Sequence, residues 1–295
     1  MCKDTTLYCC EVIDMSGNTN IAEEFFSVKG YDFSSIFDYE TKEQRHILYF
    51  QDQDSADSAI GELKNIGSVW HDMGVRLSEP TRFSIEKKDW SEVWKKYFKI
   101  QHVSDRVVIK PTWLEYDQKD ENEVIIELDP GMSFGTGRHA TTRFCIKMLD
   151  KLVRQAGLEK SVIDAGCGSG ILSIAAYKLG FREISAFDND PGCIITTTEN
   201  LELNKIDPSE IILEERGLQN ADTSKQYDIV IANIMAHILV ENRDILKSLM
   251  CKNGHLILAG ILTEEYCEVR SKFEELGLTE VNSITEDEWT GGMFV

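Results

Sequence analysis

The chain has 295 residues, enough for about two domains, and its formal net charge of −20 argues against direct binding of nucleic acid, because phosphates would be repelled. It contains nothing that resembles a signal peptide and no apolar run approaching the roughly 20 residues of a membrane span. The 8 cysteines include no Cys-x-x-Cys pair and no metal-ligand spacing, so we expect reduced thiols in a cytoplasmic protein without a metal site.

Residues 1–82 predict a small α+β domain. Its strands are expected at Thr5–Ile13, Asp32–Tyr39, Arg45–Phe50 and Val69–Leu77, and its helices at Asn20–Phe26 and Ser55–Ile66. The order βαββαβ is that of a ferredoxin-like fold. Residues 1–80 hold 6 basic and 15 acidic side chains, a net charge of −9, and show no catalytic constellation. We therefore interpret the domain as a recognition module; a structural appendage is the alternative.

A linker helix is predicted at residues 83–100. Within EKKDWSEVWKKYFK, which spans Glu86–Lys99, aromatic residues recur at intervals of three and four, and lysines occupy the other face. Residues 81–100 are a basic exception in an acidic chain, with 6 basic and 3 acidic side chains. Aromatics beside lysines can also indicate nucleic-acid binding, but packing of a linker helix on its neighbours is the favoured interpretation.

From residue 101 onward, alternating strands and helices predict a doubly wound α/β domain, 101–295, with ligands at the carboxyl ends of its strands. The expected strands are Arg106–Lys110, Glu123–Leu128, Val162–Ile163, Glu183–Phe187, Ile211–Leu213, Tyr227–Ala232, Gly254–Ala259, Glu280–Glu286 and Met293–Val295. The expected helices are Thr141–Arg154, Ile171–Leu179, Pro191–Asn204, Met235–Met250 and Glu264–Leu276.

The stretch Ser161–Asp190, SVIDAGCGSGILSIAAYKLGFREISAFDND, has the pattern of one nucleotide-binding βαβ half. Asp164 precedes three alternate glycines, at Gly166, Gly168 and Gly170, whose backbone can approach a ligand closely. Asp188, which ends the next strand, can accept hydrogen bonds from both hydroxyls of a ribose. The dinucleotide fingerprint needs a sixth-position glycine where Ile171 stands, which disfavours a nicotinamide dehydrogenase.

A second glycine-rich segment, DPGMSFGTGRHATT, lies between Asp129 and Thr142. Gly131, Gly135 and Gly137 fall within seven residues, more than an ordinary connection needs, and suggest backbone folded tightly over a ligand. Phe134 is a candidate wall of that pocket. A purely structural loop with Phe134 in the core is the alternative.

These motifs resemble the bacterial ribosomal protein L11 methyltransferase (PrmA) family, with VIDAGCGSGILSIAAYKLG, AFDNDP, VIANI and the linker sequence covering roughly Glu86–Gly260. The resemblance implies a Rossmann-like, seven-stranded class I methyltransferase domain behind a ferredoxin-like domain, with S-adenosylmethionine as cofactor. It also implies methylation of lysine side chains and the N-terminal amine of a basic large-subunit ribosomal protein. Arg138, Ala140, Met235–Leu239 and the segment after Trp289 depart from the family's usual residues.

The resemblance places the family's cofactor contacts at Thr142, Gly166, Asp188 and Asn233. With the residues argued from the pattern, the candidate cofactor site comprises Phe134, Gly137, Thr142, Asp164, Gly166, Gly168, Gly170, Asp188 and Asn233. Asn233 is also the candidate that orients the acceptor amine, without acid–base chemistry. His139 and His237 could take a proton from that amine, but structural roles are favoured for both.

Three functions remain open at this point. The favoured one is a monomeric ribosomal-protein methyltransferase. The second is a lysine methyltransferase of another protein, such as an electron-transfer flavoprotein subunit. The third is a cofactor-binding ribosome-assembly factor without catalysis, which the presence of Asp188 and Asn233 disfavours.

Overall fold

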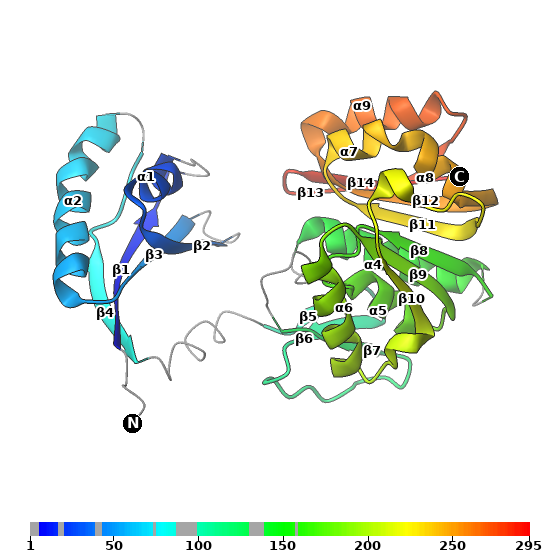
Figure 1. Cartoon of the computed structure of the whole chain (residues 1–295), viewed down its shortest axis with the longest axis horizontal. Helices are drawn as coiled ribbons and strands as arrows, with labels where there is room; N and C mark the ends of the chain where they lie inside the picture. Colours follow the sequence, from blue (N-terminus) through cyan, green and yellow to red (C-terminus); the bar gives the residue numbers. More distant parts are fainter. Residues whose placement is uncertain are drawn as a thin grey trace. The chain divides into compact units, whose positions relative to one another are not determined.

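The computed structural model describes residues 6–16, 21–38, 43–72, 75–86, 99–129, 139–156 and 159–295. The chain divides into two compact units, residues 1–98 and 99–295, drawn in Figure 1 in blue to cyan and in green to red. The predicted boundary between the linker and the second domain, at residue 100, stays a prediction, and each unit is treated by itself below.

The first unit contains a four-stranded antiparallel sheet in the order β2-β3-β1-β4. In chain order, its elements are β1 (Thr6–Asp14), α1 (Ile21–Lys29), β2 (Asp32–Asp38), β3 (Glu43–Phe50), α2 (Gln53–Asp72) and β4 (Thr81–Glu86). This order and pairing form a ferredoxin-like arrangement, as predicted. Buried side chains of the strands and both helices, among them Phe26, Leu48 and Leu63, form its main core.

The strand predicted at Val69–Leu77 is wrong, because α2 continues through that segment to Asp72. Leu63, Ile66 and Trp70 follow one another at helical spacing, so Trp70 extends the buried face of α2. Its ring packs edge-on against Phe25, with 5.1 Å between centroids, and the side chain is 6% exposed. Tertiary packing thus overrides the β propensity of tryptophan.

The fourth strand of this sheet is supplied by residues that were expected to begin the linker. β4 runs through Glu86 and pairs with β1 from Thr81 onward. The prediction of a linker helix is therefore wrong for residues 83–86. Residues 87–98, which carry its aromatic and lysine pattern, lie outside the described residues.

The second unit is built on a mostly parallel seven-stranded sheet in the order β10-β9-β8-β11-β12-β14-β13. Its strands are β8 (Ser161–Ala165), β9 (Glu183–Asp188), β10 (Ile211–Glu215), β11 (Tyr227–Asn233), β12 (Met250–Leu262), β13 (Glu280–Glu286) and β14 (Trp289–Phe294). β14 runs antiparallel to β12 and β13, so these two C-terminal strands complete the sheet as predicted.

Helices cover both faces of this sheet. They are α4 (Ala140–Ala156), α5 (Ile171–Leu179), α6 (Pro191–Leu203), α7 (Ala236–Glu241), α8 (Arg243–Leu249) and α9 (Thr263–Glu274). A small sheet of β5 (Gln101–His102), β6 (Val107–Lys110) and β7 (Val124–Glu127) precedes α4. The helix predicted at Met235–Met250 is interrupted: Asn242 separates α7 from α8, and Met250 already begins β12.

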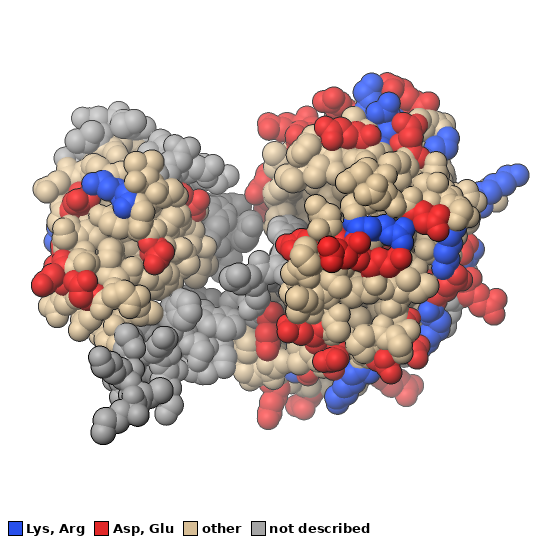
Figure 2. Space-filling model, in the orientation of Figure 1, with Lys and Arg blue, Asp and Glu red and all other residues tan. Residues whose placement is uncertain are grey.

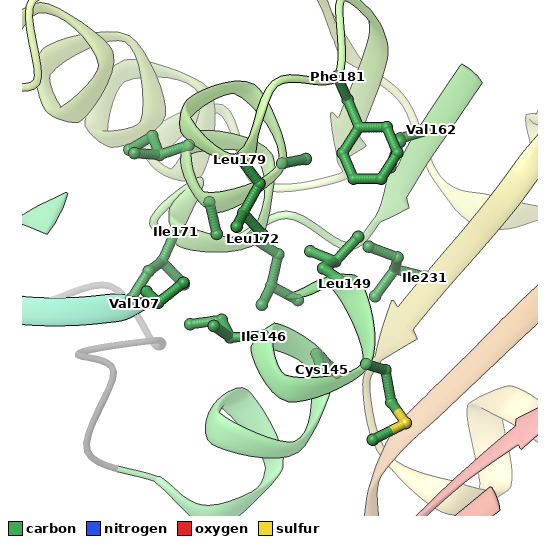
Figure 3. Packing of buried hydrophobic residues seen from close by; sticks show 14 of the residues in the cluster. Val107, Cys145, Ile146, Leu149, Val162, Ile171, Leu172, Leu179, Phe181 and Ile231 are labelled. Atoms are coloured by element: carbon green, nitrogen blue, oxygen red, sulfur yellow. The ribbon is translucent and has the colours of Figure 1, made fainter. Parts of the chain in front are cut away.

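Two apolar cores lie on opposite faces of the sheet, because successive strand residues point to opposite sides. Ile229 and Ile231 of β11 join the core formed with α4 and α5, whereas Val230 and Ala232 join the core formed with α7, α8 and α9. Figure 3 shows the first of these cores, in which Leu149 of α4 and Leu172 of α5 converge near Ile231. The near-continuous apolar run of β11 is thereby explained by burial on both faces.

Replacement of Gly291 by alanine tests the packing of α4 on β14. A Cβ at Gly291 would lie 2.2 Å from Cδ1 of the buried Phe144. We expect Gly291→Ala to lower the free energy of unfolding by about 1–3 kcal/mol, measured by urea denaturation. Gly61→Ala is the control: Gly61 is exposed inside α2, and a Cβ there would meet no described atom within 4 Å outside the helix's own backbone, so the substitution should stabilise the first unit by roughly 0.5–1 kcal/mol. Equal effects of the two changes would contradict this description.

Candidate cofactor and acceptor site

The glycine turn joins β8 to α5 at the carboxyl edge of the large sheet. Gly166, Gly168 and Gly170 have φ values of 80°, 54° and 76°, a region that glycine occupies without a steric penalty. A Cβ at Gly166 would lie 2.7 Å from Cγ2 of Ile234, and one at Gly170 would lie 2.6 Å from Cγ2 of Thr197. The turn therefore needs glycine both for its backbone conformation and for its close neighbours.

Asp188 lies at the end of β9, directly beside this turn. Its Oδ2 accepts a hydrogen bond from the backbone N–H of Gly168 at 2.9 Å, and its Oδ1 accepts one from the N–H of Asp190 at 3.0 Å. Each carboxylate oxygen has a further lone pair. The structure thus brings the predicted acid and the glycine turn together and leaves the acid able to accept further hydrogen bonds.

Asp164 is completely buried at the end of β8. The hydroxyl of Ser173 donates a hydrogen bond to its Oδ2 at 2.8 Å, while its buried Oδ1 has no partner within the described part of the chain. Burial is the main cause that raises the pKa of the Asp164 carboxyl from 3.8 to about 6, with the charge of Asp188 adding to the effect. A cationic group next to Oδ1 would favour the ionised form.

Asn233 ends β11, the strand beside β8, and faces helix α4. Its Nδ2 donates a hydrogen bond to Oγ1 of Thr142 at 3.5 Å, and Thr142 is fully buried. Its Oδ1 is also buried and finds no hydrogen-bond partner among the described residues. Ile234, the next residue, packs over Gly166, so the Thr142–Asn233 pair lies close to the glycine turn.

These features fit S-adenosylmethionine. The turn offers backbone that can approach a ligand closely, Asp188 offers acceptors for ribose hydroxyls, and Asp164 and Asn233 each offer a buried acceptor without a partner within the described part. Two candidates, Phe134 and Gly137, lie outside the described residues, which omit positions 130–138.

The family model for ribosomal protein L11 methyltransferase (PrmA) matches residues 12–293, which covers both units. The chain belongs to this family. A ribosomal protein L11 methyltransferase of Clostridium botulinum (strain Eklund 17B / Type B) is 40% identical over 266 residues, covering 88% of this chain and 82% of that protein. One from Acetivibrio thermocellus is 42% identical over 205 residues, covering 70% of this chain and 63% of that protein.

A solved structure has the same fold. The ribosomal protein L11 methylase of Lactobacillus delbrueckii subsp. bulgaricus is 31% identical, with a TM-score of 0.61, and the match covers 67% of this chain and 98% of that chain. The predicted class I fold, the methyltransferase activity and the use of S-adenosylmethionine are thereby confirmed. The assignment of individual site residues stays a prediction.

Within the described residues of this PrmA-family methyltransferase, no helix is long and apolar enough to cross a membrane. The same residues contain no group of His, Cys, Asp or Glu side chains that could hold a metal ion.

Residues of α6 that the sequence did not single out hold the glycine turn from outside. The hydroxyl of Thr197 donates to the carbonyl of Gly168 at 3.0 Å, and Nδ2 of Asn200 donates to the carbonyl of Ser169 at 2.8 Å. Their spacing of three places both on one face of α6, which is the signal that could have found them. The sequence does not show which part of the chain this face of α6 packs against, so the spacing alone does not link the two residues to the glycine turn.

The two candidate histidines lie in different settings. Nδ1 of His139 is 2.7 Å from the Thr141 hydroxyl, and its ring meets that of Trp289 edge-on at 4.7 Å. Burial lowers the pKa of His139. His237 is exposed on α7. These contacts favour a structural role for His139.

The pH dependence of stability tests the burial of Asp164. Its folded-state pKa of about 6 lies above the unfolded value, so the stability it contributes is fully present below pH about 4 and is lost as the pH rises through about 6. We expect the difference in unfolding free energy between the wild type and Asp164→Asn to fall by about 1–3 kcal/mol between pH 4 and 7, in urea titrations without cofactor.

Ser173→Ala is the companion variant for this measurement. The Ser173 hydroxyl lowers the pKa of Asp164, so its removal should move the loss of stability to higher pH. A difference between wild type and Asp164→Asn that stays constant with pH would contradict the assigned burial.

Proposed function

We propose that this enzyme transfers methyl groups from S-adenosylmethionine to lysine side-chain amines, the N-terminal amine or both, of a basic protein, and that this protein is ribosomal protein L11. The observation that carries the proposal is the family match, which extends from residue 12 to residue 293 and so includes the acidic first unit as well as the cofactor site. The names of the relatives point to the same acceptor.

In this proposal, the cofactor contacts come from the carboxyl ends of the interior strands β8, β9 and β11, from the start of α4 and from the two glycine-rich segments. Asp188 accepts hydrogen bonds from the ribose hydroxyls, and the turn Gly166–Gly170 supplies close-fitting backbone. Asp164 supplies a buried acceptor for the methionyl ammonium. Phe134 and Gly137 contribute cofactor contacts from the second glycine-rich segment. Thr142 contributes one from the start of α4, and Asn233 contributes one from the end of β11.

When bound, S-adenosylmethionine supplies a methyl group on a sulfonium centre, which a neutral amine attacks in line. The chain's own task is therefore alignment of that amine. The carbonyl oxygen of Asn233 accepts a hydrogen bond from the amine and turns its lone pair toward the methyl group. A lysine in water has a pKa of about 10.4 and is therefore protonated at neutral pH, so the amine must first lose a proton to water before its lone pair can attack.

The first unit is proposed to recognise the acceptor through charge. Its residues 1–80 carry 6 basic and 15 acidic side chains. Figure 2 shows carboxylates spread over the drawn face of this unit with few lysine or arginine side chains between them. A basic ribosomal protein is attracted to such a surface, which raises the rate of encounter. We further propose a monomer that acts in the cytoplasm; the described cysteines form no disulfide.

Replacement of Asp188 tests the proposed ribose contact. Asp188→Ala removes both carboxylate acceptors and should weaken binding of S-adenosylmethionine by about 1.5–3 kcal/mol, measured by calorimetry. Asp207→Ala is the matched control, because Asp207 is an exposed acid that accepts hydrogen bonds from Ser209 in the turn before β10, at the amino edge of the parallel strands. Unchanged affinity in Asp188→Ala would refute the assignment.

The acceptor is tested with labelled S-adenosylmethionine and a lysate of bacteria that lack methylated L11. We expect mass spectrometry to identify L11 as the labelled protein, with methyl groups on lysine or N-terminal amines. Label on a different protein alone would refute the proposed acceptor while leaving the methyltransferase intact.

Salt dependence tests the proposed steering. The affinity for purified L11 should fall as the salt concentration rises from about 0.05 to 0.5 M, because ions screen attraction between exposed charges. An affinity that stays flat over this range would exclude electrostatic steering by the first unit.

A further inference from the structure

A cavity of about 510 Å³ lies in the second unit, away from the glycine turn. One side of it is formed by β6, β7 and the loop between them, and the other by the ends of α5 and α6, which lie beside β7 (Figure 1). Both helices begin at the carboxyl edge of the large sheet, after Gly170 and Asp190, and end at its amino edge. The cavity and the candidate cofactor site therefore lie at opposite ends of the same two helices. Its volume is that of a small-molecule site.

Hydrogen bonds hold the two sides of this cavity together. Nζ of Lys178, in the last turn of α5, donates to the carbonyl of Ile125 in β7 at 2.6 Å. Asn204, which ends α6, accepts a hydrogen bond from the N–H of Glu127 at 2.9 Å and donates one to the carbonyl of the same residue at 2.7 Å. The free edge of β7 is thus tied to both helices, and the cavity beside it is a fixed part of the fold.

Three lysines line the cavity. Lys110 is 8% exposed, and its Nζ lies 2.7 Å from Oε1 of Glu127 and donates to the carbonyl of Leu114 at 3.1 Å. Lys178 is half-buried and Lys205 is exposed. Within the described part of the chain, neither of these two forms an ion pair with a carboxylate. Because an ammonium has three donors, both can donate further hydrogen bonds into the cavity.

The charged form of Lys178 is disfavoured where it stands. Burial is the main cause that lowers the pKa of its ammonium from 10.5 to about 8, and the charges of Lys205 and Lys110 lower it as well. Glu127 acts in the opposite direction, but its carboxylate is already paired with Lys110. An anion beside Lys178 would stabilise the charged form and would satisfy its remaining donors.

The carboxylates of the cavity limit the size of that anion. Glu115 and Asp117, both exposed, line the cavity from the loop between β6 and β7. A compact anion can contact the lysines at the helix ends, whereas a long polyanion would also meet these carboxylates and be repelled. The lining therefore favours a small charged molecule and disfavours nucleic acid.

We propose that this cavity is a second binding site of the enzyme, which takes a small multivalent oxyanion through the ammonium groups of Lys178 and Lys205. Ammonium groups bind phosphate and carboxylate oxygens as point charges, so the ligand carries one of these groups. The site is separate from the methyl-transfer centre and is filled in addition to the cofactor. It does not depend on the identity of the acceptor protein.

Calorimetry on the full-length enzyme tests the site with two probes, at constant ionic strength and without divalent cations. Inorganic pyrophosphate represents phosphate ligands, and citrate represents carboxylate ligands. We expect one molecule of at least one probe to bind per chain, and the tighter probe identifies the class. Saturating S-adenosylhomocysteine should leave this affinity unchanged, because the cofactor site lies at the other end of α5 and α6.

Three variants test the role of the lysines. Lys178→Met should weaken binding of the probe by about tenfold or more, since it removes a charged donor. Lys205→Gln should weaken it by about two- to fivefold, the effect expected for an exposed charge. Lys205 is exposed, so this variant tests the site even if Lys178→Met destabilises the fold by leaving the carbonyl of Ile125 without its donor. Lys252→Gln is the matched control, because Lys252 is an exposed lysine of β12 that does not line the cavity.

Three results would overturn the proposal. Neither probe could bind at millimolar concentrations, S-adenosylhomocysteine could displace the bound probe, or Lys252→Gln could weaken binding as much as Lys205→Gln does. Displacement would place the probe in the cofactor site, and equal losses would show general attraction to surface lysines. Failure of L11 to be methylated would refute the proposed acceptor and leave this test intact.

Discussion

The site depends on one interaction above all, the hydrogen bond from the backbone of Gly168 to the carboxylate of Asp188. It joins the glycine turn that follows β8 to the end of β9, and the parallel register of the two strands makes it possible. Parallel strands bring their carboxyl ends to one edge of the sheet. The same edge receives Asn233, because β11 pairs with β8 on its other side.

Burial on both faces of the sheet fixes this register. In β11, alternate residues enter two separate apolar cores, so a slip of one residue would exchange the two sets and misplace Asn233. The apolar packing therefore does more than stabilise the second unit. It also sets the positions of Asp164, Asp188 and Asn233 along their strands, and so relative to the glycine turn. The polar side chains of α6 then hold the carbonyls of that turn in place.

Much of this arrangement could be predicted because its signals are local. The glycines, the acid before them and the acid that ends the next strand lie within one short stretch, and the period of the apolar residues identifies the elements around them. The errors came where local signals conflict with packing. Trp70 favours a strand by propensity but lies on the buried face of α2, and Asn242 interrupts a segment whose apolar period is helical throughout.

By itself, the sequence determined most of the order of the elements, the ferredoxin-like and doubly wound classes, the nature of the cofactor turn and the acidity of the first unit. Only the tertiary structure decided which polar atoms meet. Thr142 and Asn233 are 91 residues apart, and nothing in their local sequences indicates that Thr142 accepts a hydrogen bond from the amide of Asn233. Likewise, the unpartnered oxygens of Asp164 and Asn233 are a property of burial. Burial depends on how helices pack on the sheet, and that packing is not encoded in any single stretch.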